Sequence, residues 1–392
     1  MSQSPIVIAA ARRTPIGSFQ GTLSALATPE LGAAAMHAAL ADTGLEPGEL
    51  SEVIMGCVLP AGLGQAPARQ AALAAGVPDS VGCTTLNKVC GSGMKAAMFA
   101  HDLLRAGSAR IVLAGGMESM SNAPYLLPKA RAGYRMGHQQ VLDHMFFDGL
   151  QNPYDGHMMG HFAEATAQKY GFSREAQDAF SIESVRRALD AIGGAFAAEI
   201  TPVTVKTRRA EQVVSADEEP GRCDIDKIPS MRPAFAKDGT VTAASSSSIS
   251  DGAAALVLTT AAEAEQRGMT PLARIVGHAG HAQAPEWFTT APVSAVQQLQ
   301  ERLGWTADDV DLYEINEAFA VVAMAAIHDL GLDPAKVNVN GGACALGHPI
   351  GATGARILVT LVHALRTRGL KRGIASLCIG GGEATAVAIE AL

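Results

Sequence analysis

Short apolar runs alternate along the chain with longer segments whose apolar residues recur at helical spacing. The short runs predict buried strands at residues 5–8, 253–258, 271–276, 310–315, 336–339, 374–377 and 384–389. Residues 94–105 repeat apolar positions every three to four residues and predict a helix. Strands that alternate with helices in this way indicate an α/β fold.

The same pattern is also repeated at long range. Residues 44–54 and 304–314 share the positions of glycine, acidic and apolar residues, and 110–116 parallels 372–381. Residues 5–8 parallel 271–276. This repetition predicts two similar halves, each built from alternating strands and helices.

One insertion distinguishes the two halves. In the second half a glycine turn leads directly to the strand at 384–389, whereas the matching strand of the first half, 253–258, comes only after residue 250. The intervening residues are rich in Met, His, Tyr, Pro and charge, and indicate a loop domain that covers the site. We expect three parts: 1–117 plus 251–270, the insertion 118–250, and 271–392.

Cys90 is the first candidate for chemistry. It lies in LNKVCGSGMK (86–95), where glycines follow the thiol and the predicted helix begins just after it. At a helix N-terminus, unpaired N–H groups and the helix dipole favour a thiolate. Taken alone, a cysteine beside glycines is more often a small buried hydrophobic residue.

Three polar or glycine-rich blocks in the second half strengthen the interpretation of Cys90 as a nucleophile. They are NEAF (316–319), NGGACALGHP (340–349) and CIGGG (378–382), and each follows a predicted strand. The carboxyl ends of strands in an α/β sheet are where such folds place their sites. We therefore expect Asn316, His348 and Cys378 to converge with Cys90.

These four side chains form a coherent chemical set. His348 can accept the proton of Cys90, and Cys90 can then attack an activated acyl group. Cys378 can move a proton at carbon, while Asn316 helps to hold an oxyanion. Backbone N–H groups of the glycines at 380–382 offer a second oxyanion hole, although a glycine run can also be a tight strand exit.

Six blocks in order give the chain a family resemblance: RTPIGSF (13–19), the Cys90 segment, AGGMESMS (114–121), NEAF, GHPIGATGAR (347–356) and CIGGG. In these blocks the chain resembles the thiolases, and within them the acetyl-CoA acetyltransferases. The resemblance implies the thiolase fold, with two βαβαβαββ halves stacked as five layers (αβαβα) and an inserted domain that binds CoA. It also implies an acyltransferase that condenses two acetyl-CoA reversibly to acetoacetyl-CoA and CoA.

The resemblance assigns a role to each candidate. Cys90 is acylated, His348 activates it, and Cys378 removes or returns the C2 proton of the second acetyl-CoA. Asn316 positions a water that, with His348, stabilises the enolate or thioester oxyanion. The backbone N–H groups of Cys90 and Gly380 form the second oxyanion hole, so the scheme is ping-pong.

The resemblance also implies contacts with the thioester and with other copies of the chain. The implied substrate-binding residues are His157, Arg222, Ser247, Phe235, Phe288, Ala318 and Phe319. Ser247 meets the pantetheine arm, and the aromatic rings of Phe288 and Phe319 favour short acyl chains. Thiolases of this type form homotetramers, and residues 65–70 match a dimer-interface stretch, so a homotetramer is expected.

Three positions depart from the family pattern. EAT (383–385) follows the triple glycine where another glycine is usual, and SSSS (245–248) replaces the common Asn-Ala-Ser. The second change keeps Ser247, but the Asn-Ala that usually precedes and supports this serine is absent. Phe180 stands where potassium-activated relatives carry tyrosine, which predicts no activation by potassium.

Composition and charge restrict the class of protein. The chain has 392 residues, of which 48% are hydrophobic and 17% charged, enough for two or three domains. We find neither a membrane span nor a signal peptide, and six cysteines without CxxC spacing suit a reducing compartment, so a cytoplasmic location is expected.

A formal charge of −8 argues against nucleic acid as a partner, yet it also repels polyanionic CoA. A local basic stretch is the expected compensation. It comprises Lys206, Arg208, Arg209, Arg222, Lys227, Arg232 and Lys237, with Arg222 placed near the adenine by the resemblance. A solvated loop with interspersed acidic residues is the competing interpretation.

No metal or cofactor is expected, because CoA thioesters are themselves the substrates. His157 and His161 have the i, i+4 spacing of a zinc site, but no glutamate follows the first histidine and no third ligand is evident. Four alternative functions remain open. They are a degradative 3-ketoacyl-CoA thiolase of broader chain length, a decarboxylating condensing enzyme, which Cys378 argues against, a silent acyl-CoA or lipid scaffold, and a cysteine hydrolase.

Overall fold

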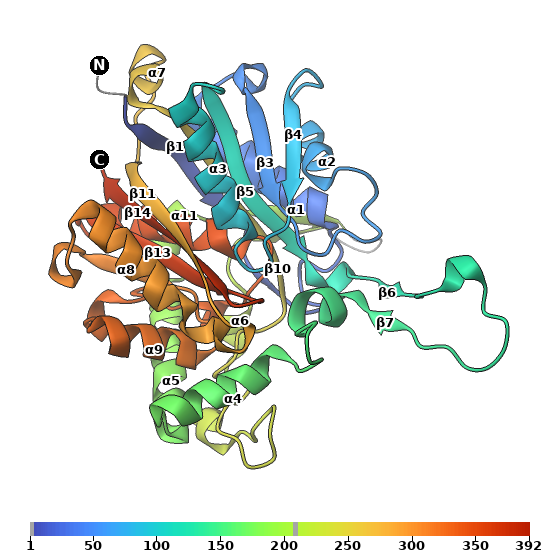
Figure 1. Ribbon diagram of the computed structural model, residues 1–392. Coiled ribbons are helices and arrows are strands. Elements are labelled where there is room, and N and C mark those ends of the chain that lie inside the picture. Colours follow the sequence, from blue (N-terminus) through green and yellow to red (C-terminus); the bar gives the residue numbers. More distant parts are fainter. Residues whose placement is uncertain (1–3, 207–210) are drawn as a thin grey trace.

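The computed structural model describes residues 4–206 and 211–392 as an α/β structure around one mixed sheet (Figure 1). The hydrogen-bonded strand order is β12-β13-β14-β11-β1-β10-β5-β3-β4, with β2 paired to β10. The strands are β1 (Ile6–Arg13), β2 (Gly17–Ser18), β3 (Glu52–Gly56), β4 (Gly82–Leu86), β5 (Ile111–Ser119), β10 (Ser250–Thr260), β11 (Ala273–Ala282), β12 (Leu312–Ile315), β13 (Arg372–Ile379) and β14 (Glu383–Ala391).

The predicted duplication is visible in the strand pairing. In the first half β3 and β5 are parallel and β5 and β10 antiparallel; in the second half β12 and β13 are parallel and β13 and β14 antiparallel. The halves join where β1 and β11 pair antiparallel, so their strands form one continuous sheet.

Helices lie outside each half and between the two halves, and each half of the continuous sheet forms one β layer, which gives the five layers that the resemblance implies. The helices are α1 (Thr28–Thr43), α2 (Pro67–Ala74), α3 (Ser92–Ala106), α7 (Ala261–Gln266), α8 (Ala291–Leu303), α9 (Ala320–Leu330), α10 (Ala343–Leu346) and α11 (Thr353–Thr367). α1 and α2 bury one face of the first half, and α8 and α9 bury one face of the second. Between the halves, α3 and α11 share a core with strands of both, which is why α11 is buried on nearly all sides.

One predicted strand is wrong. Residues 336–339 do not form a strand: a 3-10 turn, Pro334–Lys336, leads to a single bridge between Val337 and Tyr313. Asn338 then takes a left-handed conformation (φ 48°), which ends any extended run. Its carboxamide accepts a hydrogen bond from the N–H of Ile315 and donates one to the Ile315 carbonyl, both at 2.8 Å, in place of a strand partner.

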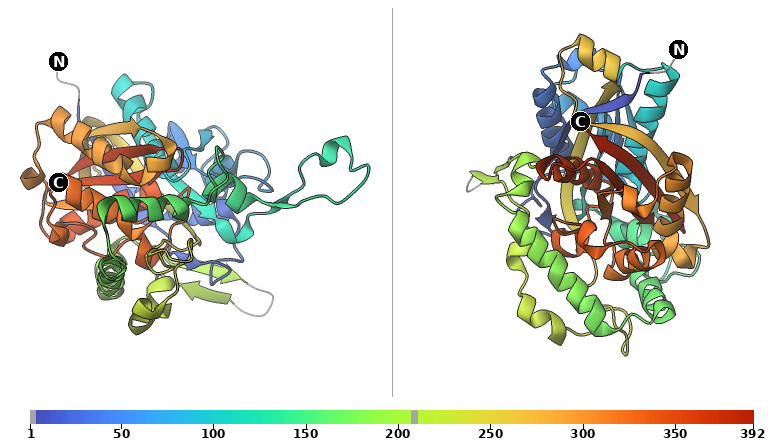
Figure 2. Two further views of the ribbon diagram at one scale, coloured as in Figure 1. Left: turned by 60° about the horizontal axis from the view of Figure 1, so that its bottom comes forward. Right: turned by 90° about the vertical axis from the view of Figure 1, so that its left-hand side faces the viewer.

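The insertion expected at 118–250 as a loop domain contains substantial helix, and its ends, 118–119 and 250, belong to β5 and β10. The elements are β6 (Tyr125–Leu126), β7 (Leu142–Asp143), α4 (Met159–Tyr170), α5 (Arg174–Ala191), β8 (Val203–Lys206), β9 (Glu211–Val214) and α6 (Glu219–Arg222). α4 and α5 pack against α9 of the second half, while β6 and β7 form an arm that projects from the body in Figure 1 and in the left-hand view of Figure 2. Across residues 4–206 and 211–392, no helix has both the length and the apolar character needed to cross a membrane.

Candidate active site

Cys90 occupies the turn that starts α3. Val89 has a left-handed backbone (φ 47°) and its N–H donates to Asn87 Oδ1 at 2.8 Å, while Ser92 Oγ accepts from the N–H of Lys88 at 2.8 Å. The predicted place of Cys90 at a helix N-terminus is therefore correct. The predicted ease of ionisation is not, because burial raises the pKa of the thiol to about 11 although the N–H groups of Gly380 and Cys90 itself face the sulfur.

His348 is buried with a defined tautomer. The Thr353 hydroxyl donates to the carbonyl of Pro349 at 2.9 Å, so its oxygen accepts from His348 Nδ1–H at 2.6 Å. Nε2 is then the unprotonated nitrogen, and it has no hydrogen-bond partner among the described residues. Burial and the nearby Arg356 lower the pKa of the imidazole to about 3, which keeps it neutral.

Cys378 lies at the carboxyl end of β13 and is fully buried. Burial, and the proximity of the Cys90 sulfur, raise the pKa of this thiol well above its usual value. This effect of Cys90 on Cys378 places the two thiols near each other, although one comes from each half of the duplicated fold. Phe288 and Phe319 belong to the apolar cluster that surrounds Cys378.

Asn316 follows β12, and its N–H donates to the Ser376 carbonyl at 3.0 Å. Its side chain is 1% exposed, and neither Oδ1 nor Nδ2 has a partner within the part of the chain that the structure describes. Leaving such groups unpaired costs on the order of 1–3 kcal/mol each, so this carboxamide is suited to hold a water or a polar ligand atom.

Cys90 and His348 line one cavity of about 200 Å³, whereas Cys378 and Asn316 are not part of its wall. Its wall includes Cys90, His348 and Gly380, and five of the predicted substrate-binding residues: Phe235, Ser247, Phe288, Ala318 and Phe319. The lining also includes apolar residues that sequence reasoning missed, namely Met120, Phe146, Leu150, Ile249 and Ile350. No polar motif distinguishes these residues in the sequence, so only their position in the fold identifies them.

Two predicted substrate-binding residues lie elsewhere. His157 is not part of this cavity wall; its side chain is 52% exposed and stacks on His161 at 4.2 Å between ring centroids. Met158 and Met159, next along the chain, line the cavity instead. Arg222 is exposed and pairs with Glu218 at 3.0 Å.

Some of the basic residues expected to attract CoA already form ion pairs with acidic residues of the same chain. Lys227 pairs with Asp224 at 2.7 Å, and Lys206 pairs with Glu211 at 3.4 Å. Arg208 and Arg209 fall outside the described residues. Neighbouring acidic residues therefore partly offset the positive charge that was expected to attract CoA.

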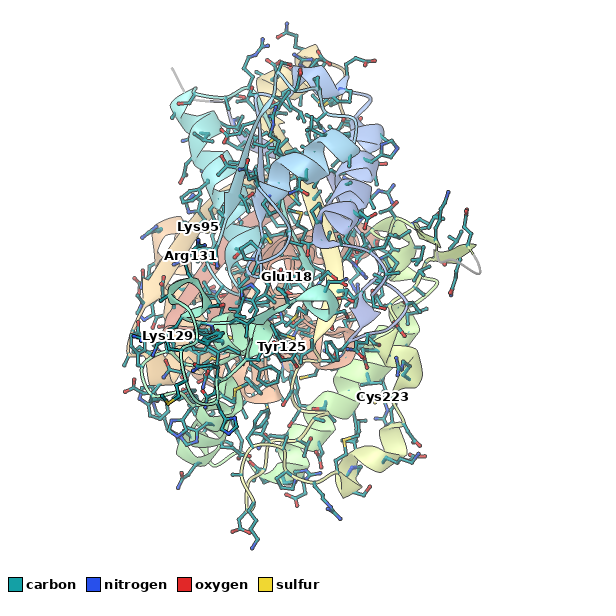
Figure 3. All side chains as sticks on the ribbon, turned by 90° about the vertical axis from the view of Figure 1, so that its right-hand side faces the viewer. Lys95, Glu118, Tyr125, Lys129, Arg131 and Cys223 are labelled. Carbon is teal, nitrogen blue, oxygen red and sulfur yellow. The ribbon has the colours of Figure 1, made fainter. Side chains whose placement is uncertain are left out.

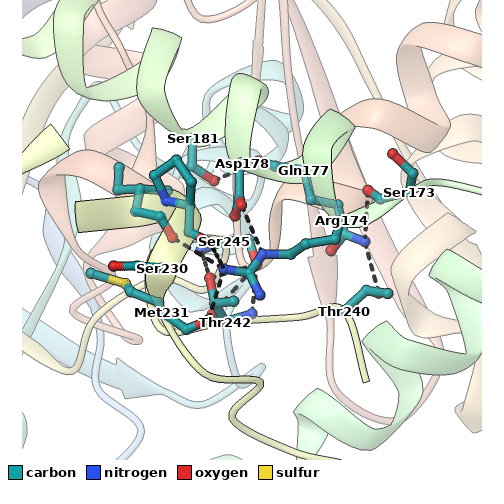
Figure 4. A network of polar contacts seen from close by, with 12 residues as sticks. Ser173, Arg174, Gln177, Asp178, Ser181, Ser230, Met231, Thr240, Thr242 and Ser245 are labelled. Carbon is teal, nitrogen blue, oxygen red and sulfur yellow. Dashed lines mark hydrogen bonds and ion pairs between the residues drawn. The ribbon is translucent and has the colours of Figure 1, made fainter. Parts of the chain in front are cut away.

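The serine run at 245–248 is firmly supported. The N–H and the hydroxyl of Ser247 both donate to the Ala318 carbonyl at 3.0 Å, which fixes this serine beside the NEAF block. Upstream, Arg174 on α5 pairs with Asp178 at 2.8 Å and donates to the Met231 carbonyl at 2.8 Å (Figure 4). This network holds the segment before residues 245–248 in place. Ser247 therefore has structural support although the usual Asn-Ala before it is replaced by serines.

Glu118 is a buried residue that sequence reasoning did not single out individually (Figure 3). Its carboxylate accepts from the N–H groups of Val58 (2.9 Å), Leu59 (3.2 Å) and Gly351 (3.0 Å). It thereby joins the loop after β3 to the loop that carries His348. Burial raises the pKa of the Glu118 carboxyl to about 7.

Comparisons with known families agree with this architecture. Residues 6–262 match the family model described as thiolase, N-terminal domain, and residues 269–391 match thiolase, C-terminal domain. An acetyl-CoA acetyltransferase of Pseudomonas aeruginosa is 49% identical, with 98% of each chain covered. One from Chromobacterium violaceum is 50% identical, with 98% of this chain and 99% of the relative covered.

Solved structures give the same picture. The acetyl-CoA acetyltransferase of Bacillus anthracis superposes with a TM-score of 0.97 at 44% identity, covering 99% of each chain. The Acat5 thiolase of Ascaris suum, solved in complex with coenzyme A, has a TM-score of 0.93 at 44% identity, covering 99% of this chain and 100% of that one.

Proposed function

Because the chain belongs to the thiolase family, we propose that it is an acetyl-CoA C-acetyltransferase, which condenses two acetyl-CoA to acetoacetyl-CoA and CoA and catalyses the reverse thiolysis. The observation that carries the proposal is that the Cys90 thiol and His348, whose Nε2 is unpaired among the described residues, line one cavity, with the Cys378 thiol near enough to Cys90 for its pKa to be affected. Full-length relatives named acetyl-CoA acetyltransferase support the choice of substrate.

Acylation comes first. The Cys90 thiol passes its proton to His348 Nε2 as its sulfur attacks the thioester carbonyl carbon. Because the thiol pKa is about 11 and the imidazole pKa about 3, the resting pair is neutral, and proton transfer accompanies the attack. The backbone N–H groups of Cys90 and Gly380 stabilise the tetrahedral oxyanion, after which the CoA sulfur leaves with the proton.

Carbon–carbon bond formation comes second. Cys378 first gives its thiol proton to His348 Nε2, and the resulting thiolate takes a proton from C2 of a second acetyl-CoA. The enolate oxygen is held by His348 Nε2–H and by a water on the Asn316 carboxamide. The enolate carbon then attacks the acetyl group on Cys90 and forms acetoacetyl-CoA, and the released Cys90 sulfur takes back the proton from His348 Nε2. The thioesters supply all reacting groups, so no additional cofactor enters this scheme.

The apolar wall favours a small acyl group. Phe288 is 2% exposed and packs edge-to-face on Phe162 at 6.3 Å, and Phe319 packs in the same way on Phe235 at 5.9 Å. Such rings leave little room beyond an acetoacetyl chain. Degradative thiolysis of longer 3-ketoacyl-CoA is the alternative function that this wall disfavours.

A homotetramer is part of the proposal, and the projecting arm supports it. Tyr125 (68% exposed), Leu127 (56%) and Met136 (91%) leave apolar surface on an arm that extends away from the body (Figure 1). Apolar side chains on a projecting hairpin are stabilised when other copies cover them. We further propose a cytoplasmic location and a role in fatty acid metabolism.

Thiolysis across a series of 3-ketoacyl-CoA chain lengths tests the function. A steep fall in kcat/KM beyond acetoacetyl-CoA is expected, and Phe288→Ala should flatten that fall by widening the cavity. Equal rates from four to ten carbons would refute the short-chain assignment. Release of free acetate without a second CoA would instead identify a hydrolase.

A further inference from the structure

His101, Asp102 and His278 form a compact cluster remote from the cavity. Asp102 Oδ1 lies 3.0 Å from His101 Nδ1 and 2.8 Å from His278 Nε2. The two imidazole rings are perpendicular, with 5.0 Å between their centroids. One nitrogen of each ring and one carboxylate oxygen all fall within 4.8 Å of one another, which is unique among possible three-ligand groups in the described ranges.

We propose that this cluster binds a divalent transition metal ion of the zinc type. Tetrahedral zinc with ligands at about 2.0–2.2 Å requires ligand atoms roughly 3.3–3.5 Å apart. The observed separations from Asp102 Oδ1 are shorter by a few tenths of an ångström, as expected for groups that now share protons. Replacing those protons by a metal ion needs only a small outward shift of each ring.

The ligands are partly preorganised. The side chains of His101 and His278 are only 15% and 19% exposed, so the surrounding protein restricts their orientation. Asp102 is 54% exposed and leaves one side of the cluster open to solvent. Three protein ligands with water in the fourth position is a common zinc arrangement, and the mixed nitrogen and oxygen donors select transition metals over magnesium or calcium.

Neighbouring cations set a limit on affinity. Arg105 follows His101 by four residues on α3 and so lies on the same face of that helix, and Arg302 donates to the backbone carbonyl of His278 at 3.2 Å. Both repel a bound dication. Removing the exposed Arg105 charge should therefore increase the affinity for the metal ion. Loss of a ligand should decrease the same affinity, so the two kinds of variant test the proposal in opposite directions.

The metal would connect the two halves of the fold. His101 and Asp102 lie on α3 of the first half, while His278 lies on β11, which begins the second half. Cys90 precedes the same helix, about 16 Å away at 1.5 Å per residue, so the ion has no part in the chemistry. Its effect is on stability.

Titration of the full-length protein, first stripped of metal with chelator, tests the proposal. Co²⁺ is the probe, because its visible spectrum distinguishes nitrogen and oxygen ligands from thiolates, and Zn²⁺ is then used in calorimetry. The variants are His278→Asn, Asp102→Asn and Arg105→Gln. The matched control is His157→Asn with His161→Asn, the other close histidine pair of the chain.

One ion per chain is expected, with a cobalt spectrum lacking the thiolate band. His278→Asn and Asp102→Asn should weaken binding at least about tenfold, Arg105→Gln should strengthen it, and the control pair should leave it unchanged. Zinc at one hundred times its Kd should raise the melting temperature by about 3 °C in the wild type and not in His278→Asn. Binding that survives His278→Asn, or that disappears only in the control pair, would overturn the proposal.

Discussion

His348 Nδ1 lies 2.6 Å from Thr353 Oγ1, and that hydroxyl is itself committed to the Pro349 carbonyl. The threonine therefore determines which imidazole nitrogen carries the proton. It leaves Nε2 free to accept the proton of Cys90. A residue five positions along the chain, itself not part of the cavity wall, thus sets the chemistry of the base.

Thr353→Val should lower kcat by about 10- to 100-fold, because both imidazole tautomers then become available and the ring loses its anchor. Thr353→Ser, which keeps the hydroxyl, should restore most of the activity. Thr360→Val is the matched control, since Thr360 lies on the same helix and donates to Glu199 instead. Equal kcat losses in Thr353→Val and Thr360→Val would show that only packing is involved.

The reactivity of Cys90 should rise with pH well beyond neutrality. With a pKa of about 11, the thiolate fraction increases about tenfold for each pH unit between 7 and 10, whereas the neutral imidazole, with a pKa of about 3, titrates far below this range. Iodoacetamide labelling, followed by peptide mass spectrometry in a Cys378→Ser background, measures this slope. A plateau between pH 6 and 8 would instead indicate a preformed thiolate–imidazolium pair.

Glu118→Gln should reduce kcat by roughly tenfold or more and lower stability by about 1–3 kcal/mol, because an amide cannot accept all three backbone N–H groups that the carboxylate accepts. The loop that carries His348 is then less firmly held. Asp251→Asn is the control: this buried carboxylate accepts from the N–H of Ser121 at 2.9 Å, away from Gly351. A loss of stability in Glu118→Gln without a larger fall in kcat than in the control would contradict a positioning role.

The sequence predicted the halves and the catalytic set because both leave local patterns. Strands, the helix after Cys90 and the glycine turns follow from periodicity and from residues that permit tight backbone turns. The prediction of a strand at 336–339 was wrong because the side chain of Asn338 takes up the backbone N–H and carbonyl of Ile315. The periodicity of apolar residues does not reveal such a side-chain contact. The expectation of a low pKa for the Cys90 thiol was wrong because burial raises this pKa by more than the N–H groups at the helix terminus lower it. The extent of burial depends on the assembled core.

Contacts between residues far apart in the chain were the other feature that the sequence did not predict. The metal cluster joins residues 176 positions apart, and each of its histidines is unremarkable in its own segment. His157 and Arg222 were assigned by resemblance alone; neither lines this cavity, and they contact His161 and Glu218 instead. Apolar residues of that wall such as Leu150 and Phe146 carry no sequence signal distinct from core packing.

The account depends most on Cys90 and Cys378 serving one acetyl group in turn. Intact-mass analysis after mixing Cys378→Ser with acetyl-CoA, together with a condensation assay, tests this directly. We expect one acetyl adduct on Cys90 that accumulates, with acetoacetyl-CoA formation reduced by about 1,000-fold or more, and no adduct in Cys90→Ala. Condensation at an undiminished rate in Cys378→Ser, or an adduct that persists in Cys90→Ala, would contradict the account.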